Sequence, residues 1–432
     1  MAPAVSIILA THNRCAVVGN TLERLAALDF PRREMQLVVV DNASNDDTVE
    51  RVTKRADVVL RLPRNLGSCA KALGVERAEA PVILFLDDDS CPHPGSVERM
   101  IEHFERQADL GAAGFRVHLP DGRQEASALP DVFVGCGVGF RATALRAVGG
   151  LDRSFFMQAE EYDLAFRLAA AGWDLQVFPD LHVLHLKTPV ARRSGRTLYY
   201  DVRNNLRVAA RYLPPPFFTA YRQDGSQRYR WLARREGYLA AYLHGLAAGR
   251  ARAAVERVQF RDRRLGPKAL ERFLRWNEIE QRMARLAAHG LRRVVLAELG
   301  KNVFAFHRAA AGAGLTILAI SDDRFALRGR RYRGTPVVGI AQAARLAPQA
   351  WIVTQMTPVH ADAARDRLRG VASSPVHAWY GTAGVQGHAM DADGLDTQTN
   401  APSFAQSTVL ERVRSADEMK KPPSSLMDVA AR

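Results

Sequence analysis

Cysteine is scarce and unpaired in this chain of 432 residues. Its four cysteines, Cys15, Cys69, Cys91 and Cys136, form no Cys-x-x-Cys motif, which excludes zinc ribbons and thioredoxin-type redox sites. We therefore expect reduced thiols, as in cytosolic proteins. No run of 18 apolar residues is present, so no membrane-spanning helix is predicted. The apolar run 5–10 leads at once into a polar loop, which is typical of a buried strand and not of a signal peptide.

Lysine is also rare, because only seven of the 60 basic residues are lysines and the rest are arginines. The segment 187–293 holds 25 basic and 8 acidic residues, a net charge of +17, whereas the whole chain carries +14. Its arginines alternate with Leu, Ala, Tyr and Trp, a pattern typical of amphipathic helices. Three interpretations of this segment stay open. Binding to an anionic membrane surface or a lipid-linked substrate is favoured, a plain solvent-exposed surface comes second, and nucleic-acid binding is least favoured.

Apolar runs alternate with helical patterns along most of the chain. Hydrophobic residues make up 47% and charged residues 25%, an ordinary globular composition. The alternation predicts an α/β fold whose sheet is covered by helices on both faces. It stops in the basic segment and restarts at position 292. We predict a first α/β domain at 1–215, a basic helical segment at 216–290, a small Rossmann-like module at 291–380 and a disordered tail at 381–432.

Polar clusters follow the successive predicted strands of the first domain. The carboxyl ends of parallel strands meet at one edge of a sheet, where ligands bind. Asp87 and Asp89 follow the strand 82–86 and lie at alternate positions, so both carboxylates could converge on one Mg²⁺ or Mn²⁺ ion. A turn with a helix N-cap is the other interpretation. The clusters after the four strands include Thr11, Asn13, Arg14, Asp41, Asn65, Gly67, Asp87, Asp88 and Asp89.

A second acidic cluster begins a predicted helix. Glu160, Glu161 and Asp163 lie in its first turn, and Leu164 and Leu168 share one helix face. Acidic side chains in this place can simply complement the helix dipole. The functional alternative is a general base among the three acids.

Eight stretches carry a family resemblance in their order along the chain. They are 5–14, 39–48, 65–67, 87–89, 135–152, 160–164, 179–185 and 199–204. Together they resemble the inverting family 2 glycosyltransferases of the GT-A fold, in particular rhamnosyl- and galactofuranosyl-transferring members. The resemblance covers roughly residues 4–215 and implies a mixed sheet flanked by helices.

The resemblance also implies a metal-dependent transfer of one sugar from a nucleotide-sugar donor to a glycan or lipid-linked acceptor, in bacterial cell-surface glycan synthesis. Asp41 matches the nucleobase contact, and Asp87, Asp89 and His185 match the metal ligands. By alignment, Glu161 matches the general base of the family, and Glu160 stays the alternative candidate for this role. The sugar-nucleotide contacts implied are Thr11, Asn13, Arg14, Asp41, Asn65, Gly67, Lys71, Asp87, Asp88, Arg203 and Asn204.

Two departures from the family pattern bear on function. The second acid of the base motif is Glu161, where the family commonly has Asp, so a catalytically silent sugar-nucleotide- or surface-binding protein stays an alternative. The Gln-x-x-Arg-Trp motif of processive synthases does not follow the base, which favours single addition. We expect a cytoplasmic protein that could lie peripherally on the inner face of the membrane.

The module at 291–380 has a degraded dinucleotide fingerprint. Asp322 lies 22 positions after Gly300, the spacing of a ribose-binding acid. Only one glycine stands in the turn 298–302, where two or three are needed for a pyrophosphate to approach the backbone. A structural or partner-binding role is therefore favoured over a bound dinucleotide.

Overall fold

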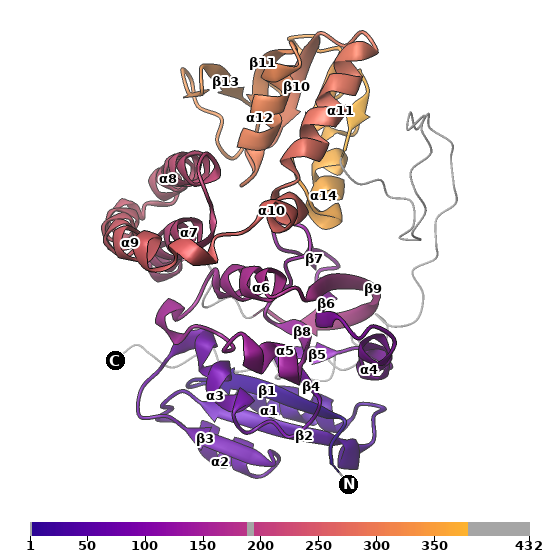
Figure 1. The fold of residues 1–432 in the computed structure, drawn as a ribbon, viewed down its shortest axis with the longest axis vertical. Coiled ribbons are helices and arrows are strands. Elements are labelled where there is room, and N and C mark those ends of the chain that lie inside the picture. The colour runs from indigo at the N-terminus through magenta and orange to yellow at the C-terminus, as the bar shows by residue number, and fades with distance from the viewer. Residues whose placement is uncertain (1, 188–193, 379–432) are drawn as a thin grey trace, which may run out of the picture. The chain divides into compact units, whose positions relative to one another are not determined.

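The computed structural model describes residues 2–187 and 194–378 (Figure 1). Its first sheet has nine strands in the order β3-β2-β1-β4-β8-β6-β9-β5, and β7 pairs with β6. Strands β1 to β4 are mutually parallel, whereas β8 runs antiparallel to β4 and β6. The predicted mixed α/β sheet is thus confirmed. The strands are β1 (Val5–Thr11), β2 (Met35–Asp41), β3 (Val58–Arg61), β4 (Val82–Leu86), β5 (Ser90–Pro92), β6 (Leu110–His118), β7 (Gln124–Glu125), β8 (Gly137–Arg141) and β9 (Asp174–His185).

Successive residues of the central strands face opposite sides of this sheet. Ile8 and Phe85 belong to one hydrophobic cluster, and Ile7 and Leu84 to another. Helices α1, α2 and α4 contribute to the second cluster, and α3, α5 and α6 to the first, so both faces are covered. Double coverage explains why β2 and β4 are buried along their whole length. The helices are α1 (Cys15–Ala26), α2 (Thr48–Thr53), α3 (Lys71–Val75), α4 (Ser96–Arg106), α5 (Ala142–Ala147) and α6 (Glu160–Ala170).

Five helices follow the first sheet and contain most of the basic segment. They are α7 (Gly195–Tyr212), α8 (Phe217–Glu236), α9 (Leu239–Gln259), α10 (Pro267–Leu274) and α11 (Trp276–Ala288). Helix α9 lies close against α7 at two glycines. A Cβ on Gly245 would stand 2.6 Å from the carbonyl oxygen of Tyr199, and one on Gly249 would stand 2.9 Å from Leu206 Cδ1. Only glycine permits this approach of the two backbones.

A second sheet of six strands is present where the alternation restarts, in the order β12-β13-β11-β10-β14-β15. All its pairs are parallel except β12 with β13. The elements are β10 (Arg293–Ala297), α12 (Val303–Gly312), β11 (Thr316–Ser321), β12 (Arg331–Tyr332), β13 (Thr335–Val338), α13 (Ile340–Ala344), β14 (Ala350–Val353), α14 (Pro358–Leu368) and β15 (Val376–His377). The predicted tail at 381–432 lies outside the described residues.

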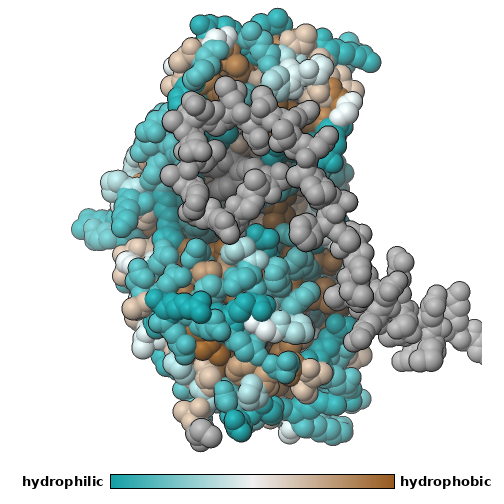
Figure 2. All heavy atoms as spheres, turned by 90° about the vertical axis from the view of Figure 1, so that its right-hand side faces the viewer, coloured by the Kyte–Doolittle hydropathy of each residue, from teal (hydrophilic) through white to brown (hydrophobic). Residues whose placement is uncertain are grey.

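One hydrophobic cluster continues from the first sheet into the second. It holds Phe166 of α6, Phe273 of α10, Trp276 of α11 and Phe306 of α12. The ring centroids of Phe166 and Phe273 are 4.7 Å apart. Figure 2 shows that hydrophilic residues cover most of the face on the side of α4 and β9, with small hydrophobic patches between them. Among the described helices, none is both long enough and apolar enough to cross a membrane.

Candidate active site

The three aspartates after β4, Asp87 to Asp89, each contact a basic side chain. Asp88 accepts a hydrogen bond from the Thr11 hydroxyl at 2.7 Å, and its carboxylate lies 2.7 Å from Arg14 Nη1. Asp89 lies 2.9 Å from Arg14 Nη2. Asp87 lies 2.5 Å from Lys71 Nζ, which also donates to the carbonyl of Gly135. The loop after β1, the helix α3 and the end of β4 therefore meet at one point.

The protonation of these aspartates follows from their surroundings. Burial raises the pKa of Asp88 to about 6, although Arg14 opposes the shift. Burial also acts on Asp87, but the ammonium of Lys71 outweighs it and holds the pKa of Asp87 below its usual range. Hydrogen bonding to His185 and the charge of Arg14 likewise outweigh burial and lower the pKa of Asp89. Two of the three carboxylates are thus held ionised beside two basic side chains.

His185, at the end of β9, joins this acidic cluster. Its Nε2 lies 3.2 Å from Asp89 Oδ1, and its Nδ1 lies 3.1 Å from Glu125 Oε2 and 3.3 Å from Cys136 Sγ. Burial disfavours the charged ring, but these partners outweigh it and raise the pKa of His185 to about 12. The predicted neighbours Asp89 and His185 are indeed in contact.

The donor set at this point fits a divalent cation. One ligand atom each of Asp87, Cys136 and His185 lie within 4.8 Å of one another. Carboxylate oxygens and imidazole nitrogens are ligands that Mn²⁺ accepts, and carboxylates suit Mg²⁺. The three carboxylates lie against Arg14, Lys71 and His185, and a cation bound here would displace the proton of His185.

The remaining predicted donor contacts lie along the same edge of the sheet. Asp41, at the end of β2, is buried and accepts hydrogen bonds from the backbone N–H of Ser44 at 3.2 and 3.3 Å. The Asn13 side chain accepts from the N–H of Asn45 at 2.8 Å, which ties the two loops together. Asn65 Oδ1 accepts from the N–H of Gly67 at 2.8 Å.

Gly67 lies in the left-handed region, with φ 68°, and its backbone packs against the carbonyl of Phe156. A side chain at this position would be strained and would meet that carbonyl.

Two glutamates begin α6 and differ in their contacts. Glu160 is buried and accepts a short hydrogen bond from the Ser68 hydroxyl. Glu161 is half-buried, and its Oε1 lies 3.2 Å from the place that a Cβ on Gly135 would take. Burial raises the pKa of both groups, and the charge of Glu160 raises that of Glu161 further. An ionised carboxylate with a raised pKa is a stronger base than an exposed one, which suits it to accept a proton from a hydroxyl.

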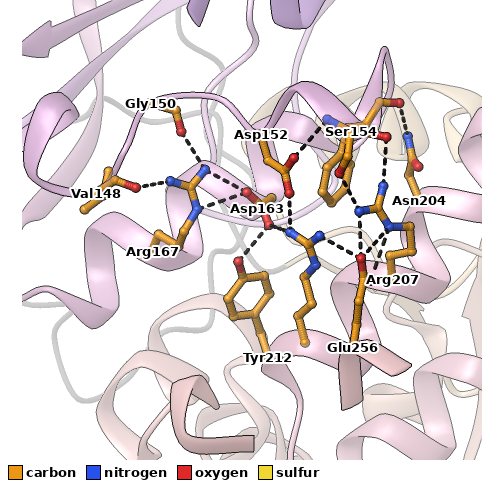
Figure 3. Close-up of polar contacts among 12 residues, drawn as sticks. Val148, Gly150, Asp152, Ser154, Asp163, Arg167, Asn204, Arg207, Tyr212 and Glu256 are labelled. Carbon is orange, nitrogen blue, oxygen red and sulfur yellow. Dashed lines mark hydrogen bonds and ion pairs between the residues drawn. The ribbon is translucent and has the colours of Figure 1, made fainter. Parts of the chain in front are cut away.

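Asp163 is engaged by three side chains, as Figure 3 shows in part. Its Oδ2 accepts from Arg167 Nη2 at 2.7 Å, and its Oδ1 accepts from the Tyr212 hydroxyl at 2.7 Å and from Arg211 Nη1 at 2.8 Å. Arg211 also reaches Asp152 and Glu256. This network fixes α6 to α7 and leaves Asp163 surrounded by protein donors.

Arg203 and Asn204 hold the loop that precedes α6. The Asn204 amide is fully buried and donates to the carbonyls of Phe155, Met157 and Gln158 at 2.7–3.0 Å. Arg203 donates to the Phe155 carbonyl at 2.7 Å. Phe156, Gln158 and Ala159 all have positive φ, so this loop needs support from outside itself. The loop sets where Glu160 and Glu161 begin the helix.

A cleft of about 450 Å³ opens beside Glu161. Its wall includes Glu125, which contacts His185, so the cleft borders the acidic cluster through this residue. Sequence reasoning did not single out Glu125 or Ser68, because neither stands in a recognisable motif. Their partners His185 and Glu160 are 60 and 92 positions away, so only the fold brings them together.

Two family models match overlapping parts of residues 6–248. The model "Glycosyl transferase family 2" matches residues 6–137, and "Glycosyl transferase family group 2" matches residues 82–248. A mycobacterial relative, the N-acetylglucosaminyl-diphospho-decaprenol L-rhamnosyltransferase of Mycobacterium tuberculosis, is 28% identical over 283 residues, which cover 52% of this chain and 88% of the relative.

Two further similarities are more limited. Glycosyltransferase AglE of Haloferax volcanii is 25% identical over 103 residues, and the match covers 22% of this chain and about a third (34%) of that relative. Among solved structures, a mannosyltransferase from Pyrobaculum calidifontis in complex with GDP-Man and Mn²⁺ is 20% identical, with a TM-score of 0.42. That similarity covers 60% of this chain and 79% of the other.

Proposed function

This chain belongs to glycosyl transferase family 2, and from that premise we propose that it transfers a single sugar from a nucleotide-sugar donor to an acceptor hydroxyl in cell-surface glycan synthesis. The observation that carries the proposal is the closeness of His185 to Asp87 and Asp89, together with its contact to Glu125, which lines the same cleft as Glu161. A candidate site for a charged leaving group thus borders the cleft that the candidate base lines.

The acidic cluster would bind the donor diphosphate together with a divalent cation. Asp87, Asp89 and His185 would hold that cation, with Mg²⁺ and Mn²⁺ both compatible. When bound, the cation supplies positive charge to the departing diphosphate. Lys71 and Arg14 already stand against the carboxylates, so they can turn toward phosphate oxygens once the cation neutralises the aspartates.

The nucleoside end of the donor would lie along β1 and β2. Asp41 is buried at the end of β2, directly opposite Thr11 in the parallel register, and its carboxylate can accept a hydrogen bond from a base. The linked loops at Asn13 and Asn45 form the neighbouring wall. Asn65 and Gly67 shape the turn between this wall and α6.

Glu161 is the proposed general base, in place of Glu160. The Ser68 hydroxyl binds the carboxylate of Glu160, whereas Glu161 lines the open cleft. Glu161 would take the proton of the acceptor hydroxyl, whose oxygen attacks the anomeric carbon on the face opposite the diphosphate. Configuration therefore inverts, and the transition state has oxocarbenium-ion character. Asp163, held by three protein donors, would orient α6 without contacting the substrate.

A panel of nucleotide sugars tests this function. Nucleoside diphosphate release should occur with one donor in the presence of Mn²⁺, and a true donor should raise the melting temperature by mass action. Asp89→Ala should abolish release and Glu161→Gln should lower it at least about a hundredfold, whereas Asp121→Asn, a change at an exposed turn, should leave it unchanged. Donor binding without turnover in the wild type would instead favour a silent sugar-nucleotide-binding protein.

We also propose that α9 lies on an anionic membrane surface. Leu243, Val255 and Val258 on this helix are 52%, 64% and 71% exposed, which is unusual for large apolar side chains. Arg250 and Arg252 are exposed on the same helix. Apolar side chains flanked by arginines suit the interface of an anionic bilayer.

Co-sedimentation with phosphatidylglycerol vesicles tests the membrane proposal. The wild type should bind, and binding should weaken in phosphatidylcholine vesicles and in a Val255→Glu, Val258→Glu variant. Equal binding by wild type and variant would contradict the proposal.

A further inference from the structure

Residues that follow strands of the second sheet form one wall of the cleft that Glu161 lines. Glu298 follows β10, Arg324 follows β11 and Gln355 follows β14, and all three line this cleft. In the strand order, β11 and β14 lie on opposite sides of β10. The strands are therefore added on one side of β10 first and on its other side later in the chain. Ligands of parallel sheets bind at this change of side, outside the carboxyl ends of the strands. The edge of the second sheet therefore faces the candidate base across a shared space.

This edge is firmly built around Glu298. The residue is 8% exposed and has a φ of 75°, a left-handed conformation that is uncommon for a side chain of this size. Its N–H donates to the carbonyl of Ser321, and its carbonyl accepts from the Thr354 hydroxyl at 2.6 Å. Its carboxylate accepts from Gln355 Nε2 at 2.6 Å and from Arg367. Strain that is held by so many contacts is typical of binding sites.

The same edge contacts the base helix directly. The Lys301 ammonium lies 4.9 Å from the centroid of the Tyr162 ring, and Tyr162 follows Glu161 in the chain. The Thr357 hydroxyl donates to the carbonyl of Ser127, whose own hydroxyl lies 3.0 Å from that of Tyr162. A molecule bound against Gln355 and Arg367 would therefore lie in the same cleft as Glu161.

A dinucleotide is a poor fit for this edge. The N–H of Leu299, in the turn where a pyrophosphate would approach, already donates to Asp322 Oδ2 at 3.0 Å. The carboxylate of Glu298 would repel a phosphate in the same turn. Asp322 is itself bound by Arg324 at 2.9 Å and is not available to a ribose.

A hydroxyl-rich neutral ligand fits better. Four acidic and four basic side chains line the cleft within the described residues, so their formal charges balance. Glu298 pairs with Arg367, and Asp322 pairs with Arg324. Paired charges keep strong donors and acceptors in place without the net field that attracts a polyanion.

From this juxtaposition we infer that the edge of the second sheet binds the saccharide part of the acceptor, with Gln355 and Arg367 holding hydroxyls that do not react. The inference rests on the proposed transferase function and names the substrate class of the same cleft. Gln355 and Arg367 are thus specificity-determining residues, supplied by a part of the chain that follows the matched family region.

The test uses the full chain with its active donor and p-nitrophenyl glycosides of glucose, galactose, mannose, rhamnose and N-acetylglucosamine as acceptors. Gln355→Ala and Arg367→Ala should raise the KM for the best glycoside at least tenfold, whereas the KM for the donor changes less than twofold. Arg369→Ala is the matched control, because Arg369 caps the same helix α14 and its side chain is 82% exposed. It should leave both KM values unchanged. Circular dichroism confirms that each variant is folded.

Saturation-transfer NMR with the same glycosides separates the two ways of failing. Wild-type protein that turns over no donor refutes the proposed function. Glycoside binding that is lost in Arg367→Ala and kept in Arg369→Ala still supports the saccharide site in that case, and no binding refutes it. Normal transfer with both KM values unchanged in Gln355→Ala and Arg367→Ala overturns the inference, as does an equal rise in both KM values.

Discussion

Arg211 and Asp163 form an ion pair in the interior of the protein, with Arg211 Nη1 2.8 Å from Asp163 Oδ1. The side chain of Arg211 is 5% exposed and that of Asp163 is fully buried. The same guanidinium reaches Glu256 on α9 at 2.7 Å. Helices α6, α7 and α9 therefore share one charged junction, and the helix that begins with the two candidate bases is anchored through it.

Arg211→Met should destabilise the protein strongly, since it removes the guanidinium that the buried carboxylates of Asp163 and Glu256 share. Breaking a buried pair from one side costs about 3–5 kcal/mol, and we expect that loss in the free energy of unfolding measured in urea. The control is Arg261→Met, whose pair with Asp262 is exposed and should contribute less than about 1 kcal/mol. Equal stability of the two variants would contradict the anchoring role.

Glu161→Gln should lower kcat by about 10²- to 10⁴-fold, the usual contribution of a general base, while the KM for the donor stays near the wild-type value. Steady-state kinetics with the active donor and acceptor measure both. Glu160→Gln serves as the comparison, because the hydrogen bond from Ser68 can persist in the amide, and its kcat should fall less. The reverse order of the two effects would assign the base to Glu160.

The pH dependence of kcat/KM should report the environment of Glu161. Burial, reinforced by the charge of Glu160, raises the pKa of Glu161 well above that of an exposed glutamate. A base acts only when ionised, so activity is present above this raised pKa and is lost as the pH falls through it. The acid limb should therefore lie well above about 4.3, the ordinary value for Glu. A limb at the ordinary value would argue against Glu161.

Removal of divalent cations should abolish turnover. Dialysis against EDTA should bring nucleoside diphosphate release to background, and Mn²⁺ or Mg²⁺ should restore it, because the leaving diphosphate needs neutralisation. Asp89→Asn weakens the cluster with His185 and should raise the metal concentration needed for half-maximal activity. Full activity in EDTA would show that Lys71 and Arg14 stabilise the leaving group without a metal.

Two glycine substitutions should have opposite effects on stability. A Cβ on Gly74 of α3 would stand 2.5 Å from Ile8 Cγ2 in the core, so Gly74→Ala should cost about 1–3 kcal/mol through overpacking. Gly225 lies inside α8 with nothing within 4 Å of its Cβ position, so Gly225→Ala should stabilise the helix by about 0.5–1 kcal/mol. Thermal unfolding followed by circular dichroism gives the sign of each change.

Local patterns sufficed to predict the four parallel strands β1 to β4 of the first sheet and the acidic cluster at its edge. The run 82–86 is apolar at every position, and it forms β4 with the same bounds. The aspartates that follow it needed only the rule that strand ends meet at one edge. Likewise, Glu160, Glu161 and Asp163 occupy the first turn of α6 as the sequence indicated.

Long-range partners could not be read from the sequence. Asp163 stood beside two glutamates as an equal candidate, and only the fold shows that Tyr212 and Arg211 surround it, 49 and 48 positions later. Arg203 and Asn204 matched a family element, yet their described hydrogen bonds support the loop before α6. The second wall of the cleft was missed altogether, since nothing in Gln355 or Arg367 indicates which sheet edge they will face.

The hydrophobic cluster that runs from Phe166 through Trp276 to Phe306 has a consequence for evolution and engineering. A chain cut between α11 and β10 would expose aromatic rings that now pack on α12. We expect such a chain to aggregate, so that its catalytic activity could not be measured. The terminal module is thus no detachable accessory. Any truncated or chimaeric version must cover these apolar side chains in another way.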